Sequence, residues 1–295
     1  MTSSDDPERP APSCERGDDG RAEPSQESRD DGRVTVALRV AYEGGPFHGF
    51  VAQPGQPTVA GALLAAIQTL DGGVSRLRCA SRTDAGVHAR AQLVAFDTTR
   101  ELAMRSWVLA LNERLPDSVA VRGAYAAAPR YEPRFDVEKK RYRYLVHTDR
   151  VRCPMLHERS WRVPALADCG DVELERMDAE LASARGCHDF AAFASARDRR
   201  EHTARTMLET RVVREAFAAR LIGIEVTGDG FLHNMVRILV GTVVDVARGA
   251  LAPGAITRAL ASKQRRDAGQ TAPAHGLCLE EVWQRTPFAG DAWPR

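Results

Sequence analysis

The residues best suited to chemistry lie in one polar segment, Ser81-Arg82-Thr83-Asp84-Ala85-Gly86-Val87-His88-Ala89, between two strand-like stretches. The segment holds a single carboxylate, Asp84, and an ionised carboxylate beside a substrate can act as a nucleophile or as a base. An Asp-x-Gly sequence between strands is also common in ordinary turns. The segment alone therefore leaves two interpretations open, a catalytic loop and a turn.

The sequence offers no motif for the common cofactors. G-x-G-x-x-G, G-x-x-x-x-G-K-[S/T] and H-E-x-x-H are absent, so dinucleotide, P-loop and zinc-protease chemistries have no anchor. The six cysteines form no C-x-x-C pair and no Cys/His cluster at zinc-ligand spacing. We therefore expect neither a metal nor a cofactor.

Periodicity predicts the elements that must position this segment. Apolar residues alternate with smaller or polar ones over 34–42, which is typical of a half-buried strand. Thr58 is a good N-cap for a helix over 58–70, which Asp71-Gly72-Gly73 would end. Further strands are predicted near 76–80, 92–96, 142–146, 207–214, 221–226 and 277–283, and further helices over 102–115, 171–185, 232–248 and 255–262.

This order of elements predicts an α+β fold made of two α/β halves, 33–134 and 135–287. Short turns between strands favour antiparallel sheets with helices on one face. A cleft between the two sheets is then the natural binding site. Residues 1–32 and 288–295 are expected to be tails.

Charge is distributed unevenly along the chain. Residues 1–32 carry ten acidic and four basic side chains, so the formal net charge of +1 leaves +7 for the remainder. The leading segment is polar and rich in Pro, Gly and Ser, so we expect it to be disordered. Three basic groups could grip phosphates, or could be solvated faces; they are Lys139-Lys140-Arg141, Arg197/Arg199/Arg200/Arg205 and Lys263/Arg265/Arg266.

Location can also be predicted from composition. The longest apolar run, near 238–246, is far shorter than the roughly 20 residues that span a bilayer. Asp5, Asp6 and Glu8 stand where a secretory signal would become apolar. We expect a cytoplasmic protein with no membrane partner.

The stretch R-T-D-A-G-V-H-A, residues 82–89, matches letter for letter the catalytic loop of the tRNA pseudouridine synthase A family. Five further stretches resemble the family in the same order and extend the resemblance over about 33–285; they are 42–49, 111–116, 141–144, 231–237 and the closing segment 272–277. Phe50-Val51 and Ala60 depart from the family pattern, which usually has Trp-Gln and Gln there. These departures concern substrate contacts and leave the loop intact.

The resemblance implies a role for each candidate site residue. Asp84 matches the catalytic nucleophile, and Arg237 the arginine that pairs with it, ideally through a bidentate contact that keeps the carboxylate charged. Tyr142 matches the active-site tyrosine, whose ring can stack on the uracil. Arg82 would support the site by filling the space of a flipped nucleotide or holding its phosphate, and His88 is assigned to substrate binding.

The residues alone allow other interpretations of three of these positions. Arg237 could lie on the solvent face of a helix, and Arg82 could form a surface salt bridge. Tyr142 and Tyr144 share one face of a strand, so both could be core residues.

The resemblance implies the pseudouridine synthase fold and a cofactor-free isomerase that converts uridine to pseudouridine at positions 38, 39 and 40 in the anticodon stem-loop of tRNA. A homodimer is implied as the working unit. Two rivals stay open: an RNA-binding protein of the same fold without catalysis, and a hydrolytic nucleosidase. The second rival usually requires another catalytic carboxylate or a metal, and the matched motifs contain no second carboxylate.

Overall fold

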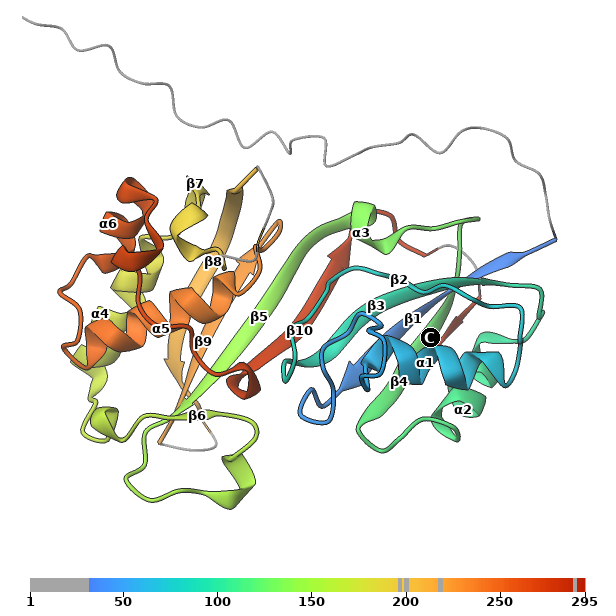
Figure 1. Cartoon of the computed structure of the whole chain (residues 1–295), viewed down its shortest axis with the longest axis horizontal. Helices are drawn as coiled ribbons and strands as arrows, with labels where there is room; N and C mark the ends of the chain where they lie inside the picture. Colours follow the sequence, from blue (N-terminus) through green and yellow to red (C-terminus); the bar gives the residue numbers. More distant parts are fainter. Residues whose placement is uncertain (1–31, 196–197, 199–201, 217–219, 289–290, 295) are drawn as a thin grey trace, which may run out of the picture.

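One sheet of eleven strands runs through the molecule in the computed structural model, which describes residues 32–295 apart from 196–197, 199–201, 217–219, 289–290 and 295 (Figure 1). The strands are β1 (Val34–Tyr42), β2 (Arg78–Cys79), β3 (His88–Thr98), β4 (Val119–Ala127), β5 (Val137–His147), β6 (Trp161–Arg162), β7 (Gly186–Asp189), β8 (Ala204–Arg214), β9 (Leu221–Gly228), β10 (Leu277–Gln284) and β11 (Ala292–Trp293). The helices are α1 (Val59–Gln68), α2 (Met104–Asn112), α3 (Pro133–Asp136), α4 (Asp171–Ala182), α5 (Met235–Ala247) and α6 (Ala255–Ser262).

The strand order β11-β4-β1-β3-β10-β5-β9-β8-β7 joins the two halves edge to edge. The α+β class is confirmed, but the expectation of two separate sheets is corrected. A short parallel pairing of β10 with β3, Cys278 opposite His88 and Leu279 opposite Ala89, makes the sheet continuous. The neighbouring pairs β1–β3 and β10–β5 are antiparallel, as predicted. Since β10 comes from the end of the chain, no local sequence pattern could reveal its partner.

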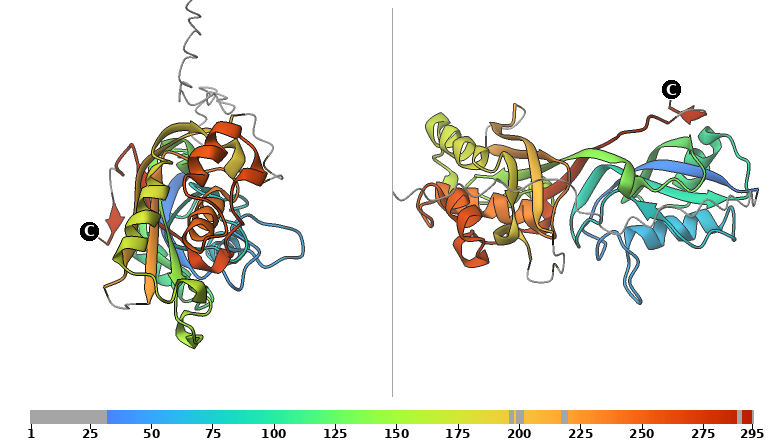
Figure 2. Two further views of the ribbon diagram at one scale, coloured as in Figure 1. Left: turned by 90° about the vertical axis from the view of Figure 1, so that its left-hand side faces the viewer. Right: turned by 90° about the horizontal axis from the view of Figure 1, so that it is seen from above.

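The predicted helices form where their caps and apolar faces require. Thr58 is the N-cap of α1, and its side chain accepts a hydrogen bond from the Gly61 amide at 3.2 Å. Helices α1 and α5 lie on the same face of the sheet (Figure 2). Helix α4 packs beside α5 and reaches the edge of β8, where Asp178 accepts a hydrogen bond from the Val212 amide. One hydrophobic cluster spans both halves.

Helix α5 is the most deeply buried of the described helices, because ten of its thirteen residues are buried. Gly241 lies where this helix meets the segment 268–272. A Cβ atom at this position would overlap the Gln270 carbonyl oxygen and lie 2.8 Å from its carbonyl carbon. Only glycine permits this close approach, which brings the closing segment against α5.

Gly241→Ala is therefore expected to lower the free energy of unfolding by about 3 kcal/mol, because the backbone of 270 must move. Helix propensity alone predicts the opposite sign, a gain of up to about 1 kcal/mol. Urea unfolding measures the difference. Gly72→Ala is the matched control, because Gly72 is exposed and its Cβ would meet only the Gln68 oxygen at 3.9 Å. A Gly241→Ala protein as stable as this control would contradict the packing argument.

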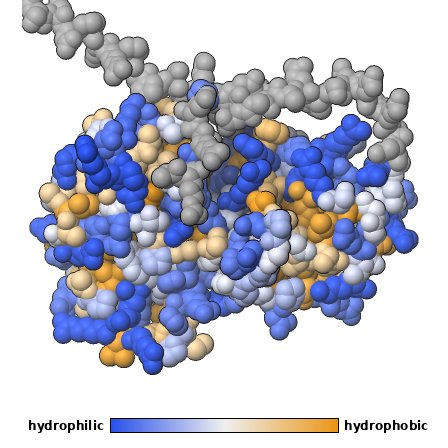
Figure 3. All heavy atoms as spheres, viewed as in Figure 1, coloured by the Kyte–Doolittle hydropathy of each residue, from blue (hydrophilic) through white to orange (hydrophobic). Residues whose placement is uncertain are grey.

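The two ends of the chain differ from each other. The predicted acidic tail, 1–32, lies outside the described residues except for Gly32. The segment 288–295, predicted as a tail, contains β11, which pairs with β4 at Ala292 opposite Tyr125. Hydrophilic residues cover most of the face drawn in Figure 3, with apolar residues in smaller patches. Among the described residues, no helix has the length and apolar character needed to cross a bilayer.

Candidate active site

The segment around Asp84 is a loop between β2 and β3 that the sheet holds rigidly. The buried Gln92 of β3 binds both backbone groups of Ser81: its amide oxygen accepts from the Ser81 N–H at 3.2 Å, and its Nε2 donates to the Ser81 carbonyl at 2.7 Å. The Tyr42 hydroxyl of β1 lies 2.7 Å from the Thr83 hydroxyl. Buried polar groups with all these partners form a well-ordered support for a loop.

The turn after β1 supports the same loop from the other side. The Phe50 N–H donates to the Thr83 carbonyl at 3.1 Å. Gly49 has a φ of +93°, and a Cβ there would lie 2.9 Å from the Thr83 carbonyl oxygen. Glycine is required for both reasons.

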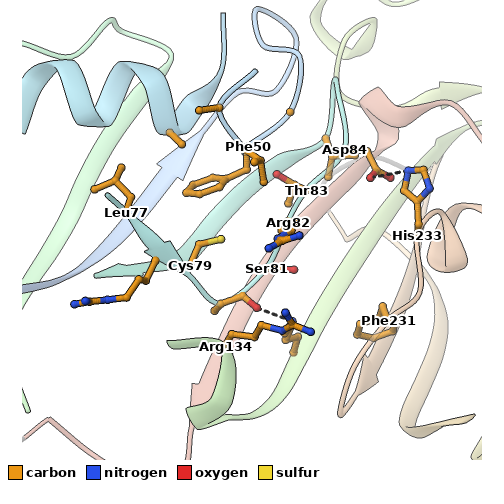
Figure 4. A pocket seen from close by; sticks show the side chains of 18 of the residues that line it. Phe50, Leu77, Cys79, Ser81, Arg82, Thr83, Asp84, Arg134, Phe231 and His233 are labelled. Carbon is orange, nitrogen blue, oxygen red and sulfur yellow. Dashed lines mark hydrogen bonds and ion pairs between the residues drawn. The ribbon is translucent and has the colours of Figure 1, made fainter. Parts of the chain in front are cut away.

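A cleft of about 1890 Å³ opens beside this loop and is lined by both halves of the molecule. The first half contributes the loop itself and the turn after β1, and the second half contributes Tyr142 and the segment from Phe231 to Arg237 (Figure 4). The family departures lie here too: Phe50 and Ala60 line the cleft, and Val51 is exposed at its rim. The prediction of a cleft between the halves is therefore confirmed, although the halves share one sheet.

Asp84 lies between the imidazole of His233 and the guanidinium of Arg237, both from the second half. The Asp84 Oδ1 is 3.2 Å from His233 Nε2, and its Oδ2 is 3.8 Å from Arg237 Nη1. Figure 4 shows Asp84 and His233 pointing toward each other across the cleft. Burial raises the pKa of Asp84, and the charges of His233 and Arg237 act in the opposite direction. The carboxylate is therefore partly desolvated and yet supported in its ionised form.

Arg237 contacts Asp84 less directly than the expected bidentate pair. Its Nε donates to the Ala272 carbonyl at 2.7 Å, and its Nη1 donates to Asn234 Oδ1 at 2.8 Å. The guanidinium therefore faces the cleft rather than solvent, and it ties α5 to the closing segment. The expected bidentate pair does not form, because the Nε and Nη1 donors that it would use already bond to Ala272 and Asn234.

Tyr142 forms part of the cleft wall. It is 6% exposed, its hydroxyl lies 2.8 Å from the Ser81 hydroxyl, and its ring meets Phe231 edge to face at 5.1 Å. Burial raises the pKa of this phenol above its ordinary value, so the hydroxyl is neutral at physiological pH. Tyr144, two residues on, is fully buried and donates to the Pro273 carbonyl at 2.7 Å. The two tyrosines thus differ, one lining the cleft and one packing in the core.

Arg82 and His88 occupy different environments. Arg82 is exposed on the cleft wall, and within the described part of the chain it has no hydrogen-bond or ion-pair partner. His88 is not among the described residues that line the cleft. Its Nδ1 accepts from the Gly44 N–H at 3.1 Å and its Nε2 lies 3.0 Å from the His275 carbonyl. The structure therefore brings four of the five predicted residues together and gives His88 bonds that join the halves.

The basic groups predicted from the sequence lie in different environments. Lys140 lines the cleft, whereas its neighbours Lys139 and Arg141 stack on the Trp283 ring at 5.0 and 5.1 Å.

The other basic groups have different partners. Lys263 pairs with Asp189 at 2.7 Å. Arg265 donates to backbone carbonyls of the segment that follows it, which is a structural role. Arg197, Arg199 and Arg200 lie outside the described residues. Arg76, Arg130 and Arg134, which no basic run signalled, join Arg82 and Lys140 along the cleft.

Sequence reasoning also missed His233 and Ser81 as members of the site. His233 lies inside the stretch 231–237 that resembles the family, so the signal was present. Its direction toward Asp84 depends on a contact between residues 149 positions apart, which no local pattern predicts.

Comparison with known proteins bears on the family of this chain. The family model described as tRNA pseudouridine synthase matches residues 39–136 and 182–283, which include Asp84, His233 and Arg237. A chain in the crystal structure of a Cbf5-Nop10-Gar1 complex aligns at 11% identity with a TM-score of 0.39 over 85% of this chain and 50% of its own, a likeness too weak to carry an argument.

Curated relatives match most of their own length. Proteins named tRNA pseudouridine synthase A are 38% identical over 247 residues in Moorella thermoacetica (83% of this chain, 97% of the relative) and 39% identical over 248 in Pelobacter propionicus (84% and 98%). The Chloroflexus aurantiacus relative is 40% identical over 249 residues (84% and 88%). This chain therefore belongs to the tRNA pseudouridine synthase family.

Proposed function

We propose that this protein is an isomerase that converts uridine to pseudouridine at positions 38, 39 and 40 in the anticodon stem-loop of tRNA. The observation that supports it best is the position of Asp84, a partly buried carboxylate at 3.2 Å from His233 and 3.8 Å from Arg237 in a cleft lined by both halves. Membership of the family supplies the substrate class.

The reaction begins with a change in the RNA. A uridine stacked in a stem cannot reach Asp84, so its nucleotide must leave the stack at a cost of a few kcal/mol. Arg82 is exposed and has donors to spare, so it fills the vacated space or holds the displaced phosphate. Tyr142 then presents its ring to the uracil, and base–aromatic stacking contributes about 1–3 kcal/mol.

The chemistry exchanges one bond at the ribose. The C1′–N1 glycosidic bond breaks, the uracil rotates, and a C1′–C5 bond forms. C5 then loses its hydrogen to solvent as a proton and N1 gains one, so atoms and oxidation state balance. Asp84 acts as the nucleophile in this account, which requires the ionised carboxylate that His233 and Arg237 favour.

The rest of the cleft suits a polyanion. Lys140 and six arginines line it, and phosphate contacts of this kind release counterions on binding. We also infer that the protein acts as a homodimer in the cytoplasm, which the family resemblance supports. We infer that the chain divides into two halves at about residues 134 and 135, which the order of elements supports.

Tritium release tests the proposed function. Wild-type protein incubated with [5-³H]uridine-labelled tRNA should release tritium to water and no free uracil. Release of free uracil would establish a nucleosidase instead. Binding of tRNA without either product would establish an RNA-binding protein without catalysis.

A further inference from the structure

Of the two side chains that pair with Asp84 among the described residues, His233 lies closer. Its Nε2 lies 3.2 Å from Oδ1, whereas the nearest atom of Arg237 lies 3.8 Å from Oδ2 (Figure 4). A nitrogen and a carboxylate oxygen at 3.2 Å are within hydrogen-bond range, and Nε2 can donate in both the Nε2–H tautomer and the imidazolium.

The backbone of His233 is fixed on both sides. Its N–H donates to Asp198 Oδ2 at 2.7 Å, and its carbonyl accepts from the Ser195 N–H at 3.0 Å. The next residue, Asn234, has a φ of +63° and is the N-cap of α5. These contacts hold the backbone of the turn between β9 and α5, from which the ring of His233 points toward Asp84.

We propose that His233 is a positioning residue for Asp84: its Nε2–H orients the carboxylate toward the nucleoside, and the charge of the imidazolium form favours the ionised carboxylate. The catalytic consequence of this inference rests on the proposed function. The electrostatic effect of His233 on Asp84 can be tested in the free protein, without catalysis.

Arg237 does not make His233 redundant. The Arg237 guanidinium is committed to Ala272 and Asn234, and it stays charged at every pH of interest. Of the two charges that lower the pKa of Asp84, that of His233 has the larger effect, and that of Arg237 the smaller.

Charged and titratable groups face Asp84 and His233 from several elements. From α5 comes Arg237, and from β5 comes Tyr142, a neutral phenol whose raised pKa reflects its burial and the nearby Asp84 charge. Asp198, from the segment before β8, accepts from the backbone of His233. The ring of His233 thus has Asp84 as its ion-pair partner among the described residues.

The sign of the pH effect follows from these contacts. Burial raises the pKa of Asp84 and His233 lowers it, so activity should be lost as the pH falls through the pKa that results. Removing the imidazole should move this acid limb to higher pH. The ratio of variant to wild-type rate should therefore fall as the pH is lowered from 8 to 5.5, by up to about tenfold for each pKa unit that the limb moves.

Two variants separate the hydrogen bond from the charge. His233→Gln retains an N–H donor without a titratable charge, and His233→Phe retains neither. Single-turnover rates of tritium release at saturating enzyme should be lower for His233→Phe than for His233→Gln at pH 8, and both should show the shifted acid limb. His202→Gln, an exposed histidine in the same half, is the matched control and should keep the wild-type limb. A variant-to-wild-type ratio that is constant across pH would reduce His233 to a packing role and overturn the proposal.

A second measurement needs no catalysis. The Asp84 carboxyl carbon, observed by ¹³C NMR in the free protein and assigned with Asp84→Asn, should titrate at higher pH in His233→Gln than in the wild type. Equal titration would overturn the proposal even if the enzyme is active. Absence of tritium release from the wild type at any pH would instead reject the proposed function, while this titration would still decide the electrostatic role.

Discussion

Asp84→Asn is expected to lower the rate of pseudouridine formation by at least about 10³-fold, the scale found when a nucleophile is removed from an enzyme. The amide has nearly the shape of the carboxylate, and the loop is held by Gln92 and Tyr42 rather than by Asp84, so the fold should persist. Affinity for tRNA should change by less than about threefold, since the basic side chains that line the cleft remain. Single-turnover tritium release and a tRNA binding titration measure the two effects.

The control for this variant is Asp117→Asn, which removes one charge from an exposed aspartate away from the cleft. Its rate should match that of the wild type. If Asp84→Asn also kept a rate within tenfold of the wild type, the nucleophile would have to be another group. If it lost tRNA affinity in the same proportion as rate, Asp84 would be a binding residue.

Arg237→Gln should lower the rate by about 10²-fold, because Asp84 loses a neighbouring charge and the closing segment loses its anchor. Leaving the Ala272 carbonyl without its donor should also lower the free energy of unfolding by about 1–3 kcal/mol. Arg237→Lys keeps the charge, but its ammonium group lacks the planar guanidinium with which Arg237 contacts Asp84, Asn234 and Ala272. We therefore expect it to recover only part of the rate, measured by single turnover beside a urea unfolding curve.

Comparison of the two Arg237 variants gives the decisive result. A lysine variant with full activity would show that charge alone matters at 237. Equal, complete loss in both variants with normal stability would show that the planar guanidinium touches the substrate, a role the present contacts do not require.

Local patterns predicted most of the elements. The alternation in β1, the Thr58 cap of α1 and the apolar face of α5 are set by neighbours within a few residues, and each element formed where those neighbours required. Strands β4, β6, β7 and β11 were missed. Their pairing partners, rather than a strong local alternation, define them.

The candidate site divides in the same way. Asp84, Tyr142 and Arg237 were found because a family motif surrounds each of them. Three features of the site depend on contacts between distant segments. Arg237 donates to the Ala272 carbonyl, His233 lies beside Asp84, and His88 bonds to the His275 carbonyl away from the cleft. These contacts depend on β10, which pairs with β3 and β5 and so joins the two halves. No local sequence pattern predicts them.

Position-specific tritium release tests the central claim most directly. Three tRNA transcripts would each carry a [5-³H]uridine at only one of positions 38, 39 and 40, and a fourth would carry labelled uridine only outside the anticodon arm. The wild type should release tritium from the first three and none from the fourth, and Asp84→Asn should release none from any. Equal release from the fourth transcript, or undiminished release by Asp84→Asn, would contradict the account.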